Sequence, residues 1–257
     1  MSQLFNFSRF GRLFSKHTTE QAGGYLLATG VLLGGIGLLL GFVAYMAAGP
    51  LLPEMQAFIF VMGLMAAGSF FTSTVFASFG DKKQATAALM LPASHAEKFA
   101  VAWLYSLPLF LAVYIGCFFL VDSLVLQLSS DGKPTEMVQL FGGERGLHTS
   151  LAAYAAVNAV FLWGSIFFIK QHFVRTAFGV LVAALALVAL NFQAMRALVG
   201  QSLNTVIPFS GLTLLEGKEW YSVSLPDGLS AWFGLVLLGV MLLAWAAAYA
   251  RVTEKQI

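Results

Sequence analysis

Six long apolar stretches without a charged residue constrain the fold of this chain more than any other feature. A bilayer core about 30 Å thick is crossed by about 20 apolar residues of helix. A helix also pairs every backbone N–H and C=O within itself, as a membrane interior requires. The stretches are residues 25–48, 57–79, 99–120, 151–169, 176–192 and 229–250. We therefore predict an all-α integral membrane protein with six transmembrane helices in one domain, residues 25–250.

The overall composition agrees with this prediction. Of the 257 residues, 59% are hydrophobic and only 10% are charged, compared with about 25% charged residues in soluble domains. The fifth stretch is the shortest, and we expect it to continue through residues 193–198 as a tilted or broken helix. The single cysteine, Cys117, excludes a disulfide within the chain.

The Lys and Arg residues outside the spans predict the orientation in the membrane. Six spans put both termini on one side, and an excess of Lys and Arg marks the cytoplasmic loops. Four basic residues fall on the side away from the termini: Lys133, Arg145, Arg196 and Lys218. Ten fall on the side of the termini: Arg9, Arg12, Lys16, Lys82, Lys83, Lys98, Lys170, Arg175, Arg251 and Lys255. We therefore predict cytoplasmic N- and C-termini, with residues 251–257 as a cytoplasmic tail.

Residues 1–24 have the pattern of a helix that lies on the membrane surface. At 100° per residue, four apolar side chains share one side and three basic ones lie opposite. The apolar set is Leu4, Phe7, Phe10 and Phe14, and the basic set is Arg9, Arg12 and Lys16. This arrangement predicts an amphipathic interfacial helix whose cations face anionic headgroups, with a bend at Gly23-Gly24. The alternative is a disordered basic tail.

The polar and small residues within the spans suit contacts between helices. Gly30 and Gly34, and then Gly37 and Gly41, repeat at the spacing that allows two helices to approach closely. Ser and Thr residues of the second span, together with Asn158 and Ser165 of the fourth, can hydrogen-bond between helices. These residues serve either packing or a translocation surface. We expect Asp122, at the outer end of the third span, to be solvated.

No residue pattern indicates catalysis or metal binding. The four histidines lie in loops or at span ends, which disfavours haem ligation within the membrane, and no regular ligand spacing indicates zinc. Gly164-Ser165 lacks the following glycine of a rhomboid-like protease. Residues 211–219 lack both the spacing and the Ser or Thr of a phosphate loop. We therefore expect a non-catalytic chain without a metal or cofactor of its own.

The loop between the second and third spans is more structured than a plain connection. It opens with Asp81, Lys82 and Lys83, continues with good helix formers over residues 84–91, and stops at Pro92. Ser94 and Glu97 then have the spacing of a capping box, so a new helix should start near His95 and run into the third span. A short amphipathic helix here could dock on a soluble partner. The alternative is an ordinary helix start with lysines that mark topology.

The stretch "LMLPASHAEKF" resembles a motif of permease subunits of type-2 ABC exporters from Bacteroidetes-like bacteria. The resemblance extends to the N-terminal "FNFSRFGRLF", to the six spans and to the place of the motif between the second and third spans. This chain departs from the family at His95-Ala96, because the family commonly has a larger residue before the glutamate. The resemblance implies an ATPase-facing element that includes Asp81, Lys82, Lys83, Leu89, Met90, Leu91, Pro92, Ala93, Ser94, Glu97 and Lys98.

The same resemblance implies a partner and a location. A separate ABC ATPase subunit would bind ATP and Mg²⁺, a second permease copy or paralogue would complete the transporter, and the protein would reside in the bacterial inner membrane. The chain would then be the permease subunit of an exporter and not an enzyme. The alternative is a membrane anchor of a larger envelope complex that binds partners through its outer loops, residues 121–150 and 193–228.

Overall fold

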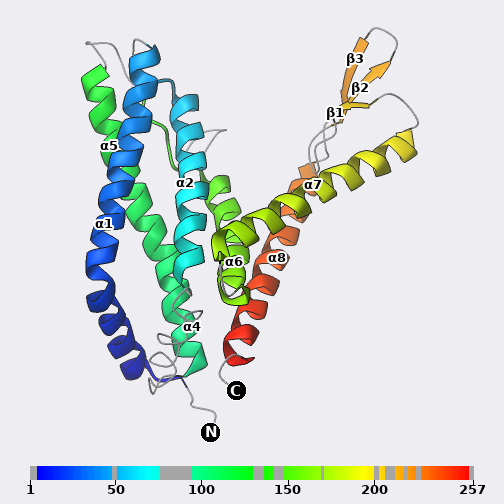
Figure 1. The fold of residues 1–257 in the computed structure, drawn as a ribbon. Coiled ribbons are helices and arrows are strands. Elements are labelled where there is room, and N and C mark those ends of the chain that lie inside the picture. The colour runs from blue at the N-terminus through cyan, green and yellow to red at the C-terminus, as the bar shows by residue number, and fades with distance from the viewer. Residues whose placement is uncertain are drawn as a thin grey trace.

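The computed structural model describes residues 5–47, 51–75, 94–129, 136–141, 147–168, 171–199, 203–205, 212–216, 219–223 and 227–254. Its elements are α1 (Phe7–Ala47), α2 (Pro53–Val75), α4 (His95–Leu104), the π-helix η2 (Tyr105–Leu109), α5 (Phe110–Ser129), α6 (His148–Phe167), α7 (His172–Val199), β1 (Leu203–Thr205), β2 (Leu212–Glu216), β3 (Glu219–Val223) and α8 (Asp227–Glu254). Figure 1 shows their arrangement.

Within the described residues, six helical segments are long and apolar enough to cross a membrane. Each overlaps one predicted span, which confirms the predicted multi-pass class. The third is longer than expected, because α4, η2 and α5 run without interruption from His95 to Ser129. The fifth, α7, continues through residues 193–198 as one unbroken helix.

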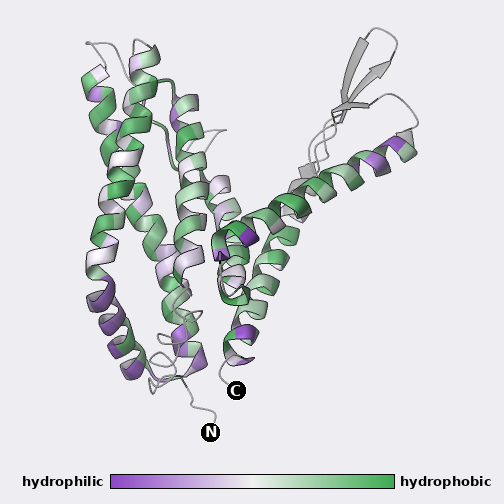
Figure 2. Ribbon diagram, in the orientation of Figure 1, coloured by the Kyte–Doolittle hydropathy of each residue, from purple (hydrophilic) through white to green (hydrophobic). Residues whose placement is uncertain are grey.

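The helices form one group around α1, α2 and α5 and another around α6, α7 and α8 (Figure 1). Helix α1 packs against α4 and α5, whereas α6 packs against α2, α7 and α8 and so links the two groups. Both chain ends lie at the same end of the helices. Figure 2 shows hydrophilic residues at that end of α1, α4 and α8.

Aromatic side chains fill the core between α1, α2 and α5. Phe60 is fully buried and meets Phe118 edge-on, with the ring centroids 5.0 Å apart. The hydroxyl of Tyr114 donates to the carbonyl of Phe60 at 2.8 Å, so this tyrosine contributes both apolar area and a satisfied polar group. A second buried cluster joins α4, α6 and α8: Ala102, Leu162, Ile166, Ala248 and Val252.

The π-helical segment η2 supplies a backbone acceptor to a neighbouring helix. Pro108 lies within it and has no N–H to continue the α-helical pattern. The Ser106 carbonyl accepts hydrogen bonds from the Tyr154 hydroxyl at 3.1 Å and from Asn158 Nδ2 at 2.9 Å. Asn158 Nδ2 also donates to Thr72 Oγ1 of α2 at 2.7 Å. The predicted hydrogen bonding between spans is therefore confirmed for Asn158 with Thr72.

Three of the other predicted polar side chains form hydrogen bonds within their own helices. Ser73, Thr74 and Ser165 donate to carbonyls three residues earlier. Their hydroxyls are satisfied locally and do not link helices.

The predicted glycine stripe of the first span does not pack closely against the rest of the described chain. A Cβ at Gly30, Gly34 or Gly41 would meet no other atom within 4 Å, and one at Gly37 would lie 3.7 Å from Val121 Cγ1. The close approaches lie elsewhere. Aromatic rings or a threonine side chain take the space of a Cβ at three positions: Gly63 against Tyr114, Gly68 against Tyr154 and Gly164 against Thr176.

Two features differ from the sequence-based expectation. Helix α1 is continuous through Gly23 and Gly24, so the predicted interfacial helix and first span form a single helix; its N-terminal part inclines relative to the rest (Figure 1). In addition, the connection between α7 and α8 contains an antiparallel sheet of order β1-β2-β3, which was not predicted. The membrane-crossing segments themselves are helical, as predicted.

We expect Gly68→Ala and Gly30→Ala to have opposite effects on thermal unfolding of the purified protein. At Gly68 the added methyl overlaps the Tyr154 ring, and overpacking of this kind costs about 1–3 kcal/mol. At Gly30 the methyl enters open space, and the higher helix propensity of Ala contributes up to about 1 kcal/mol of stability. Equal shifts in melting temperature would contradict the packing described here.

Candidate functional site

The carboxylate of Glu97 lies at the centre of a polar network at the end of the bundle that holds both termini. Its side chain has 0% exposure. Oε2 accepts the Ser94 backbone N–H at 2.9 Å, and the Glu97 backbone N–H donates to Ser94 Oγ at 3.2 Å. These two bonds are a complete capping box at the start of α4. The predicted capping box and the predicted helix start at His95 are both confirmed.

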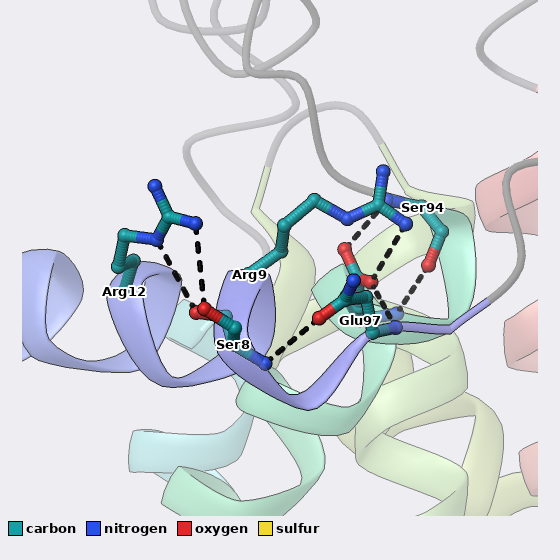
Figure 3. A network of polar contacts seen from close by, with 6 residues as sticks. Ser8, Arg9, Arg12, Ser94 and Glu97 are labelled. Atoms are coloured by element: carbon teal, nitrogen blue, oxygen red, sulfur yellow. Dashed lines mark hydrogen bonds and ion pairs between the residues drawn. The ribbon is translucent and has the colours of Figure 1, made fainter.

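The other carboxylate oxygen of Glu97 connects to the beginning of α1. Glu97 Oε1 accepts the backbone N–H of Asn6 at 2.8 Å, and Arg9 Nη2 lies 3.5 Å from the same oxygen. Figure 3 shows the Arg9 side chain pointing toward Glu97 and Ser94. Charged acceptors make the stronger class of hydrogen bond. One buried side chain therefore joins two segments that are 91 residues apart in sequence. We call Asn6, Arg9, Ser94 and Glu97 the Glu97 network.

Asn6 also caps α1. Its Oδ1 accepts the Ser8 N–H at 2.9 Å, and its carbonyl accepts the Phe10 N–H at 2.9 Å. Asn is among the preferred residues at a helix N-cap. Arg12 binds Ser8 through the backbone carbonyl and the hydroxyl, both at 3.4 Å (Figure 3). Asn6 was not predicted as a cap, although an Asn directly before a helix is a signal that could have identified it.

The structure adds a contact within the protein to the predicted polar side of the N-terminal helix. Arg9, which was assigned to that side, is half-buried, and its Nη2 lies 3.5 Å from Glu97 Oε1. Phe7, which was assigned to the apolar face, is 83% exposed, as a side chain that faces lipid would be. The 100° pattern could not show that a buried carboxylate lies beside Arg9, and the amphipathic interfacial helix itself stays a prediction.

The remaining predicted residues of this helix fall into two groups. Arg12 and Lys16 are exposed, as expected for the polar side, and Lys16 Nζ lies 3.7 Å from a carboxylate oxygen of Glu20. Leu4 lies outside the described residues.

Aromatic side chains hold the N-terminal part of α1 against η2. The Tyr105 ring lies 5.1 Å from Phe14 and 4.7 Å from His17, measured between centroids. His17 Nε2 and the Tyr25 hydroxyl are 2.8 Å apart, and the Thr18 and Tyr105 hydroxyls hydrogen-bond. Neither Tyr25 nor Tyr105 was predicted from the sequence to have a role. The predicted interfacial helix thus packs on the bundle next to the Glu97 network.

Of the predicted ATPase-facing element, the structure describes only Ser94, Glu97 and Lys98. Lys98 is 8% exposed, which leaves little of its side chain for contact with a partner. Glu97 is equally inaccessible and can only brace neighbouring segments. The other predicted interface residues lie outside the described part of the chain: Asp81, Lys82, Lys83, Leu89, Met90, Leu91, Pro92 and Ala93.

The Glu97 network is suited to a mechanical connection between the start of α1 and the start of α4.

Among the described residues, no group of three or more His, Cys, Asp or Glu side chains could hold a metal ion. Comparison with protein-family models, with curated proteins and with solved structures found no match to this chain.

We expect Glu97→Ala to lower the melting temperature and to release the N-terminal segment. The change leaves the Asn6 and Ser94 N–H groups without their acceptor. This lowers the free energy of unfolding by about 1–3 kcal/mol for each group that stays buried. Trypsin should then cleave after Arg9 and Arg12 faster than in the wild type. The matched control is Glu20→Ala, which removes an exposed pair and should cost no more than about 0.5 kcal/mol. Equal cleavage rates in the two variants would contradict the assigned role of Glu97.

Proposed function

We propose that this chain is the transmembrane permease subunit of an ABC exporter, driven by a separate ATPase that docks on residues 80–98. The Glu97 network is the observation that supports the proposal. It connects the N-terminal helix to the start of α4 through a buried carboxylate. In the family that the sequence resembles, the N-terminal interfacial helix and the loop after the second span are the parts nearest the ATPase. A displacement of either one is passed to the other through direct hydrogen bonds.

The orientation that this function requires is supported by the charge distribution. Basic residues at the end of the bundle that holds the termini include Arg9, Arg12, Lys16, Arg175 and Arg251, whereas Arg196 lies at the far end of α7. An excess of Lys and Arg marks the cytoplasmic side. The proposal therefore places both termini in the cytoplasm and the protein in the bacterial inner membrane.

In the proposed mechanism the chain transmits force and does no covalent chemistry. ATP and Mg²⁺ bind to the partner ATPase, and closure of two ATPase subunits shifts the docked loop. The Glu97 network moves the starts of α1 and α4 together. The movement then continues along α4 into η2, whose Ser106 carbonyl is bonded to Tyr154 and Asn158 of α6. Rearrangement of two permease bundles opens or closes a path between them.

A membrane anchor of an envelope complex is the second candidate, and the sheet β1–β3 favours it. The sheet lies beyond the far end of α7, away from both termini (Figure 1). Its position would offer a partner on the outer side a folded surface outside the apolar helices. Crosslinking distinguishes the two functions, because an anchor should crosslink mainly through residues 121–150 and 193–228 and a permease mainly through residues 82–94.

The triple substitution Leu89→Asp, Met90→Asp and Leu91→Asp should abolish binding of the ATPase and leave membrane insertion intact. Acidic groups in an apolar docking contact would lose hydration without gaining partners. Co-purification of an ATPase from the native membrane should fall at least about tenfold, which corresponds to about 1.4 kcal/mol of binding free energy.

The matched control is the double variant Met137→Asp and Phe141→Asp. Both residues are exposed and apolar, and both lie in the segment between α5 and α6. This control should retain the ATPase. Normal ATPase recovery with the triple variant would refute the docking site.

A further inference from the structure

Asp122 of α5 is a buried carboxylate that none of the contacts described above uses. Its side chain has 0% exposure, and neither Oδ1 nor Oδ2 has a hydrogen-bond partner. The expectation that it would be solvated is therefore wrong. It was based on a span that ends at residue 120, whereas α5 continues to Ser129 and packs Asp122 against the bundle. Ionisable groups buried in membrane helices are costly and commonly mark function.

The part of α5 that carries Asp122 belongs to an apolar cluster. Neighbouring Val121 lies against Gly37 of α1, and the same cluster contains Phe118 and Leu126 of α5. Helix α5 packs on α1, α2 and η2. The buried side chains that these elements contribute to the cluster are Ile36, Leu40, Ala44, Phe60, Leu64 and Leu107.

The described residues around Asp122 provide no cation to neutralise it. Residues 25–47, α2, η2, α5 and residues 136–141 contain no Lys, Arg or His. The basic residues of α1 all lie within its N-terminal part, at the Glu97 end of the bundle. The other titratable groups on these elements are Tyr25, Tyr45, Glu54, Tyr105, Tyr114, Cys117 and Glu136.

An ionised carboxylate in this position would be strongly unfavourable. Removing an unpaired charge from water costs several kcal/mol or more even after the protein relaxes. A protonated carboxyl avoids the charge penalty, although its polar atoms still lack partners. The packing observed between α1 and α5 is therefore compatible with the neutral acid and not with the anion.

We propose that Asp122 is a proton-binding site that controls the contact between α1 and α5. With the proton bound, the neutral carboxyl stays within the bundle as seen here. When the proton leaves to solvent, the anion must be hydrated, so α5 separates locally from α1 and admits water. The ligand is a proton and not a metal ion, because hard cations such as Ca²⁺ require six to eight oxygens, and no group of three or more acidic, His or Cys side chains exists among the described residues. This inference does not depend on the exporter function.

The single cysteine of the chain gives a direct test. Cys117 is buried and unbonded on the same helix, five positions before Asp122. Its alkylation rate reports how often the α5 packing opens. The rate is measured in the purified full-length protein from pH 5 to pH 9, for the wild type and for Asp122→Asn, a neutral mimic of the protonated acid. The ratio of the two rates removes the intrinsic pH dependence of the thiol.

The ratio of wild-type to Asp122→Asn rates should rise at least about tenfold between pH 5 and pH 9, since each pH unit favours the ionised, open form by a further factor of ten while the closed form keeps its proton. Glu136→Gln, which changes an exposed acid, should behave as the wild type. A ratio that is constant with pH would overturn the proposal. So would a ratio that follows the sodium concentration at fixed pH, or an Asp122→Asn protein that fails to fold.

Discussion

Polar groups that leave water must find partners within the protein, and this constraint determines where the helices are joined. Buried polar side chains connect segments that are distant in sequence, and Gln56, Asn158 and Glu97 are three examples. Gln56 binds the carbonyls of Leu51 and Glu136 at 2.9 and 3.0 Å and accepts the Val138 N–H at 2.9 Å. Asn158 links α6 to Thr72 and Ser106, and Glu97 links α4 to α1. In an apolar medium each such bond is costly to leave unmade.

These joints form a connected route through the molecule. Glu97 fixes the start of α4 to the N-terminal helix, and α4 continues directly into η2. The Ser106 carbonyl of η2 holds Tyr154 and Asn158 of α6, and α6 packs against α2, α7 and α8. A force applied at the Glu97 network can therefore reach most of the membrane helices through hydrogen bonds and packed side chains. The proposed permease function requires such a connection.

Local features of the chain could be predicted from the sequence. The six spans depend on hydropathy over about 20 residues, and the capping box depends on Ser94 and Glu97 within one turn of helix. The β-sheet also had a local signal that was overlooked: Gly217-Lys218 separates two five-residue strands, as in a two-residue hairpin.

Features that depend on distant parts of the chain could not be predicted. The hydropathy of residues 1–24 does not show that Arg9 turns toward Glu97. The sequence of the third span does not show that α5 extends past Asp122 and buries it. The glycine spacing of the first span indicated a close approach that the structure instead places at Gly63, Gly68 and Gly164. In each case tertiary contacts determined the outcome, and the ATPase partner remains a prediction from sequence.

The most direct test of the permease function is to identify what remains bound when the tagged protein is extracted from its native membrane. Extraction in mild detergent followed by mass spectrometry measures the partners and their stoichiometry. We predict a soluble ATPase with a phosphate loop, recovered in stoichiometric amount. Recovery of an envelope protein from the outer side without any ATPase would contradict the permease function and favour the membrane anchor.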